Sequence, residues 1–87
     1  RSDCIVKEIN WVSIEAPNKP IRVEVQIRYR SKAVKAQLVP MLDSLKGTYY
    51  EKYKVCFDEN QFSISPGQAA VFYRGDFVLG GGIITRN

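Results

Sequence analysis

The sequence contains no histidine, and this absence excludes a good deal of chemistry. Histidine is the commonest general base and the commonest metal ligand in proteins. The only cysteines, Cys4 and Cys56, are far apart and form no Cys-x-x-Cys arrangement of the kind found in zinc sites and dithiol redox pairs. The residue inventory therefore argues against an enzyme.

Long apolar runs are missing as well. No stretch approaches the ~20 apolar residues of a membrane helix, so we expect no membrane contact and a cytoplasmic location. The chain opens Arg1-Ser2-Asp3, without an initiator methionine or the apolar core of a signal peptide. Its 87 residues have room for one small domain. We expect residues 1–87 to be a single domain excised from a longer protein.

Two free thiols fit a cytosolic protein, in which disulfides seldom persist. A Cys4–Cys56 disulfide is the alternative that the sequence leaves open.

The clearest pattern in the chain is a strict alternation over residues 21–30, with apolar side chains at odd positions and polar or charged ones at even positions. A period of two predicts a strand with one face in a core. Further strands are predicted at residues 4–11, with Ile5, Ile9 and Trp11 on one face, at 34–39, ended by Pro40, at 54–57, at 69–73 and from Phe77 onward.

Turn signals separate these short strands. Ser65-Pro66-Gly67-Gln68 places proline and glycine at the two central positions of a type II turn. Short strands at such intervals indicate a small antiparallel barrel or a sandwich, and a barrel is favoured because so short a chain must hide its strand edges. The run Gly80-Gly81-Gly82 is better explained as a structural bend than as a phosphate cradle, since the Lys-Ser/Thr of a P-loop is missing. Residues 41–53 form either a helical turn or a long hairpin, and we favour a hairpin with its tip at Gly47-Thr48.

A basic stretch follows the alternating strand. Four cations, Arg28, Arg30, Lys32 and Lys35, fall within eight residues that contain no acid, and Arg22 shares the outward face of Arg28 and Arg30. Arginine offers planar, multidentate donors to phosphate. The stretch indicates a nucleic-acid surface, although the net charge of +4 also fits the solvated face of an ordinary basic domain. The acids Asp58, Glu59 and Asp76 fit surface turns better than a catalytic pair.

Several strings stand in a specific order: Asn10-Trp11, Arg28-Tyr29-Arg30, Phe57-Asp58-Glu59, the nine residues 65–73, Gly75-Asp76 and the six residues 79–84. Together they resemble the C-terminal domain of the bacterial tRNA-specific 2-thiouridylases. The resemblance covers nearly the whole chain and is most specific in the final twenty residues. It implies an all-β fold, a small antiparallel six-stranded β-barrel similar to domain 2 of translation elongation factors, which helps to hold tRNA.

The resemblance also implies site residues. The family's tRNA contacts in this domain fall on the Arg-Tyr of the R-Y-R motif and on the Gln of P-G-Q, which here are Arg28, Tyr29 and Gln68. From the basic stretch we add Arg22, Arg30, Lys32 and Lys35 as supporting phosphate contacts. The family activates a wobble uridine with ATP and magnesium in an N-terminal domain that this chain lacks. We therefore expect no catalytic residue, cofactor or metal here, and Cys4 and Cys56 do not inherit the family's catalytic role.

The expected partners are tRNA and, for the longer enzyme, a sulfur-donor protein, with the protein a monomer. Two alternatives remain. The domain could be purely a structural cap, or it could be a docking module for the sulfur donor that uses Tyr49 and Tyr50. The chain departs from the family in its extended segment at 41–52, where most relatives have a short acidic turn, and in Arg74, which adds a positive charge.

Overall fold

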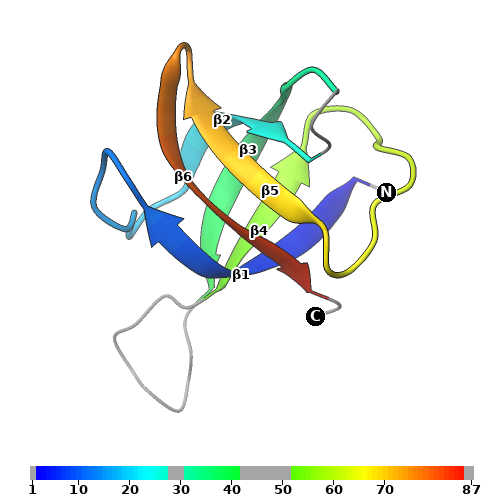
Figure 1. The fold of residues 1–87 in the computed structure, drawn as a ribbon, viewed down its shortest axis with the longest axis horizontal. Coiled ribbons are helices and arrows are strands. Elements are labelled where there is room, and N and C mark those ends of the chain that lie inside the picture. Colours follow the sequence, from blue (N-terminus) through cyan, green and yellow to red (C-terminus); the bar gives the residue numbers. More distant parts are fainter. Residues whose placement is uncertain (1, 28–30, 42–51, 86–87) are drawn as a thin grey trace.

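The computed structural model describes residues 2–27, 31–41 and 52–85, and these form six antiparallel strands. The strands close into a barrel in the order β1-β4-β3-β2-β5-β6, with β6 pairing back onto β1 (Figure 1). Their bounds are β1 Asp3–Trp11, β2 Ile21–Gln26, β3 Val34–Met41, β4 Lys52–Phe57, β5 Ala69–Arg74 and β6 Phe77–Thr85. The predicted six-stranded antiparallel barrel is confirmed. In the described part of the chain, no helix is long and apolar enough to cross a membrane.

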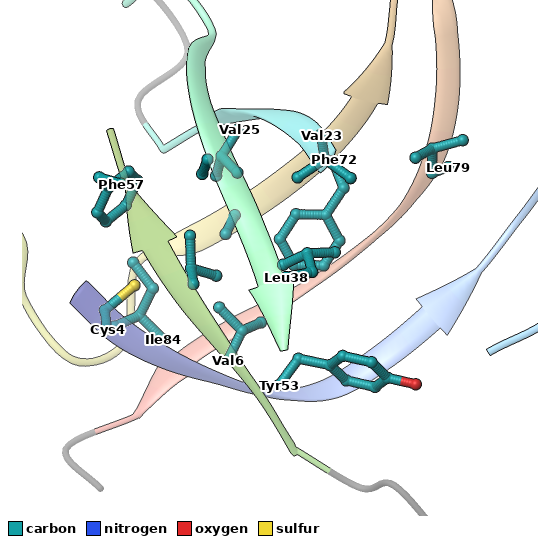
Figure 2. Packing of buried hydrophobic residues seen from close by; sticks show 13 residues of the cluster. Cys4, Val6, Val23, Val25, Leu38, Tyr53, Phe57, Phe72, Leu79 and Ile84 are labelled. Carbon is teal, nitrogen blue, oxygen red and sulfur yellow. The ribbon is translucent and has the colours of Figure 1, made fainter. Parts of the chain in front are cut away.

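The core fills the inside of the barrel with side chains from every strand (Figure 2). The alternation predicted for β2 is confirmed over its described residues, because Val23 and Val25 are buried in the core whereas Arg22 is exposed to solvent. Leu38, Tyr53 and Phe72 are fully buried. In β2, β3, β4 and β5 alternate positions thus face inward, as a closed sheet requires.

Strand β1 changes its inward face partway along. Cys4 and Val6 are buried, whereas further on Ile9 and Trp11 pack against the core. Between these pairs the register with β6 shifts, and Glu8 has a left-handed φ of 53°. A β-bulge of this kind adds one residue and reverses which positions face inward. The prediction that Ile5 shares the face of Ile9 and Trp11 is therefore wrong.

The three glycines lie inside one continuous strand, β6, which curves along the barrel (Figure 1). A Cβ at Gly80 would lie 2.5 Å from the Asn10 carbonyl oxygen, and one at Gly81 would lie 2.7 Å from that of Ala70. A Cβ at Gly82 would collide with the Lys7 carbonyl oxygen. The glycines serve close backbone approach at the seam between β1, β5 and β6, so they do not fit a phosphate cradle.

Strand β3 continues through Pro40, so the prediction that this proline ends the strand is wrong. Pro40 pairs with Tyr53 of β4, and the β3–β4 pairing runs on to Met41 opposite Lys52. On its other side, β3 pairs with β2 no further than Leu38. Proline is tolerated there because that side has no ladder partner among the described strands. The pairing of Met41 with Lys52 supports the predicted hairpin, whose connection 42–51 and tip at Gly47-Thr48 lie outside the described residues.

The two cysteines stand on adjacent strands, Cys4 buried and Cys56 half-buried, and no disulfide joins them. This agrees with the reduced cysteines that the sequence favours over a Cys4–Cys56 disulfide.

Candidate nucleic-acid interface

The turn that carries Gln68 is fixed by hydrogen bonds on both sides. Gly67 has a φ of 94°, a conformation that favours glycine, as the predicted turn requires. The Ser65 backbone N–H donates to Gln68 Oε1 at 2.9 Å, while the backbone of Gly67 and Gln68 exchanges two bonds of 2.8 Å with Ile84 of β6. Because its oxygen is used inside the turn, the Gln68 side chain offers its NH₂ group to an outside partner.

The strand directions bring this turn to the end of the barrel at which β2 finishes. Neighbouring strands are antiparallel throughout, so the β2–β3 and β4–β5 connections emerge at one end, and the β1–β2, β3–β4 and β5–β6 connections emerge at the other (Figure 1). Gln26 pairs with Val71, three residues after Gln68. Arg28, Tyr29 and Arg30 themselves lie outside the described residues.

Lys32 lies at the same end as Gln68. It is exposed and lines a small hollow with Ser31 of the β2–β3 connection and with Gln61 and Phe62 of the β4–β5 loop. This hollow contains about 40 Å³. The structure thus brings together two of the loops in which binding residues were predicted.

Arg22 forms an ion pair that the sequence did not reveal. Its Nη2 donates to Asp58 Oδ2 at 2.5 Å, and both side chains are exposed. This hydrogen bond holds the pKa of Asp58 below its usual value, and the nearby charge of Lys35 acts in the same direction. Asp58 is therefore more than a solvated turn acid, and it partly neutralises the two cations nearest to it.

Lys35 and Arg22 also line a shallow groove of about 340 Å³ with Arg74 of β5. Val23, Glu24 and Tyr73 complete its walls. Glu24 pairs with Lys35 across β2 and β3, and its Oε1 accepts a 3.2 Å hydrogen bond from the Gly75 N–H. Arg74 is an added positive charge in the sequence, but the sequence gives no sign that it lines the same groove as Arg22. The pairing of β2 with β5 brings the two arginines to this groove. The groove wall carries mixed charge, with three cations around one acid.

Within the described ranges, no group of three or more His, Cys, Asp or Glu side chains is placed to hold a metal ion. The glycines of β6 are packed against backbone atoms.

Comparison with known proteins places the chain in a family. It is 58% identical over 84 residues to the tRNA-specific 2-thiouridylase MnmA of Rippkaea orientalis, covering 97% of this chain and 22% of that protein. It is 56% identical over 87 residues to the MnmA of Prochlorococcus marinus strain MIT 9211, covering 97% and 21%. It is 51% identical over 82 residues to that of Microcystis aeruginosa, covering 94% and 21%.

These matches confirm the resemblance to the 2-thiouridylases that the motifs indicated, and the chain spans about a fifth of the length of these relatives. A second comparison, with protein families, matches residues 1–84 to the family described as the aminomethyltransferase beta-barrel domain. The chain belongs to the aminomethyltransferase beta-barrel domain family.

Proposed function

We propose that this barrel is the tRNA-holding C-terminal domain of a longer, cytoplasmic tRNA-specific 2-thiouridylase. The observation that carries the proposal is the pairing of Gln26 with Val71, which brings the end of β2 toward the turn of Gln68. The names of the relatives and the acid-free basic stretch support it. In this proposal the chain is one non-catalytic domain of a monomeric enzyme that also meets a sulfur-donor protein.

The barrel would act by positioning. Arginine and lysine side chains at this end would neutralise phosphates, and the Gln68 NH₂ would donate to a phosphate or sugar oxygen. Such contacts fix the register of a bound RNA without reading its bases. In the longer enzyme, ATP with magnesium would supply the activation of the uridine in another domain. The residues of this chain would bind and orient the RNA.

A Gln68→Glu substitution in the full-length enzyme tests the proposal. A glutamate oxygen can still accept the Ser65 N–H, so the turn is retained, but the donor is lost and a negative charge faces the RNA. Losing a hydrogen bond to a charged group predicts tRNA affinity lower by about tenfold or more. The measurement is a filter-binding titration, with an unchanged melting temperature as evidence that the turn is intact.

An Arg28→Ala substitution in the full-length enzyme tests the electrostatic part of the proposal, as Gln68→Glu tests the hydrogen bond. Each phosphate contact contributes about 0.7 to 0.9 to the slope of log Kd against log salt, so this variant should weaken binding and flatten the slope by about that amount. If both variants bind tRNA with the affinity and salt dependence of the parent, the barrel does not hold the RNA at this end.

An Asp58→Asn substitution is expected to have the opposite effect. It removes the carboxylate that Arg22 and Lys35 now face, which leaves both cations available for phosphate. We expect tRNA to bind up to about fivefold more tightly, since exposed ion pairs are worth at most about 1 kcal/mol. The salt slope should also steepen. A comparison with the Arg22→Ala, Asp58→Asn double variant shows whether the gain depends on Arg22, and an equal gain in both would exclude Arg22 from the contact.

One observation favours a second function, that of a structural cap. Val12, Phe77 and Val78 are exposed at the other end of the barrel, where the Val12 N–H donates to the Leu79 carbonyl oxygen at 2.8 Å. An exposed group of apolar side chains is typical of a protein contact. Deleting the barrel from the full-length enzyme distinguishes the two functions. A lower melting temperature with full tRNA affinity would support the cap.

A further inference from the structure

Phe62 is the most exposed of the large apolar side chains among the described residues, at 83%. It belongs to the β4–β5 loop, which leaves the barrel at the same end as the turn of Gln68 (Figure 1). Two other phenylalanines, Phe57 and Phe72, are 7% and 0% exposed. Single exposed apolar residues are common, so exposure alone assigns no role to Phe62.

The backbone beside Phe62 gives a second observation. Ser63 has a φ of 60°, in the left-handed region that residues other than glycine, asparagine and aspartate seldom adopt. Such a conformation costs about 1 kcal/mol or more, and it persists where the surrounding structure holds it, often at binding sites. The chain therefore keeps an unfavourable backbone conformation directly after the side chain that it leaves exposed.

The surroundings of Phe62 combine one cation, Lys32, with polar and apolar side chains. The hollow beside the ring is lined at its rim by Ser31, Lys32 and Gln61, and on its inner side by the apolar residues Val25, Ile27, Val34 and Ile64. No acid is among the described residues that line it. At about 40 Å³ the hollow holds no more than a few water molecules, so a nucleobase would lie against the outside of the ring.

A flat ligand with a phosphate fits this arrangement better than an apolar protein surface does. Exposed aromatic rings beside cations are how proteins hold unpaired nucleotides, because every base has a face that can stack and a phosphate that a lysine can pair with. By contrast, exposed Phe77 is accompanied by exposed Val78 and Val12 at the other end of the barrel, and several exposed apolar side chains at one end are what a protein contact requires.

We propose that Phe62 stacks on an unpaired base of the bound RNA while Lys32 pairs with a neighbouring phosphate. The inference rests on the proposed function and deepens it. Phosphate contacts fit any RNA backbone, whereas a stacking residue requires a base that is free of its helix. Phe62 would thus make the barrel prefer a loop, a bulge or an end of the RNA over a continuous duplex.

The test compares Phe62→Ala, Phe62→Trp and Phe77→Ala in the full-length enzyme, with tRNA titrated at several salt concentrations. Stacking of one base predicts that Phe62→Ala weakens binding by about 5-fold to 150-fold. The salt slope should not change, because stacking releases no counterions. Phe62→Trp should restore the affinity, and its new indole should be quenched by RNA. Phe77→Ala should bind as the parent does.

Melting temperatures close to the parent's are expected for all three, since both phenylalanines are largely exposed. The stacking proposal is overturned if Phe62→Ala binds tRNA like Phe77→Ala, or if the tryptophan variant fails to restore binding. If the stacking proposal is overturned but Gln68→Glu and Arg28→Ala still weaken tRNA binding, the proposed function stands and only the role of Phe62 is rejected. If Gln68→Glu and Arg28→Ala also leave tRNA binding unchanged, the proposed function is rejected together with the stacking proposal. Loss of sulfur-donor capture by Phe62→Ala with tRNA affinity intact would assign the ring to a protein contact instead.

Discussion

Replacing Gly82 with alanine is expected to destabilise the barrel more than any other single-methyl addition discussed above. The new Cβ would collide with the Lys7 carbonyl oxygen and would lie 2.8 Å from Val6 Cγ1 and 2.9 Å from Ile9 Cγ1. The first of these atoms belongs to the backbone of β1 and cannot rotate away. Overpacking of a tight site costs about 1 to 3 kcal/mol, and we expect the upper end here.

Thermal unfolding followed by circular dichroism measures this effect. For a domain of this size, a loss of about 3 kcal/mol lowers Tm by more than about 10 °C. The matched control is Gly75→Ala, where φ is 59° but nothing lies within 4 Å of the added Cβ. Its cost should be only the left-handed backbone conformation, about 1 to 2 kcal/mol. Equal losses of Tm in the two variants would show that crowding at the seam is not what requires a glycine at position 82.

Truncating Phe72 to alanine should remove a large share of the stability of the domain. Phe72 is fully buried, and its ring centroid lies 5.9 Å from that of Trp11. Emptying such a site costs about 3 to 5 kcal/mol, because the lost burial adds to the cavity that remains. A chain of 87 residues has a total stability of about 4 to 13 kcal/mol, so this single change consumes a large share of it.

Urea unfolding measures the loss, and Phe77→Ala is the control of the same residue type. At 72% exposure, Phe77 should change the free energy of unfolding by less than about 0.5 kcal/mol. If the two phenylalanine variants unfold at the same urea concentration, the side chain of Phe72 does not hold the core together as Figure 2 implies.

The fold could be predicted where a local pattern decides the structure. The alternation around Val23 and Val25 fixes which face of β2 enters the core, and the Pro66-Gly67 pair matches a turn with a φ of 94° at Gly67. The alternation and the turn each depend on only a few neighbouring residues, so the sequence is enough to predict them. Closure into a barrel followed from the need to pair every strand edge in a short chain.

Features that depend on a partner strand could not be predicted in this way. The bulge at Glu8 is visible only in the register of β1 against β6, and Pro40 is tolerated because β2 has not begun beside it. The ion pair of Arg22 with Asp58 joins residues 36 positions apart. None of these has a signature in the residues next to it.

The candidate site shows the same division. Arg28, Tyr29 and Gln68 came from the resemblance, and they stay predictions. That Lys32 and Phe62 line the same hollow could not be predicted, because they belong to two loops that meet only at one end of the folded barrel. An exposed phenylalanine within a polar segment is the signal in the sequence that could have drawn attention to Phe62.

The pairing of β1 with β6 has a consequence for synthesis on the ribosome. The strand nearest the start of this chain finds one of its two neighbours only in residues 77–85. Until those residues leave the exit tunnel, β1 and β5 each keep a bare edge, and contacts so distant in sequence form slowly. The nascent domain must therefore wait, exposed to aggregation, for its last strand before it can complete its hydrogen bonding.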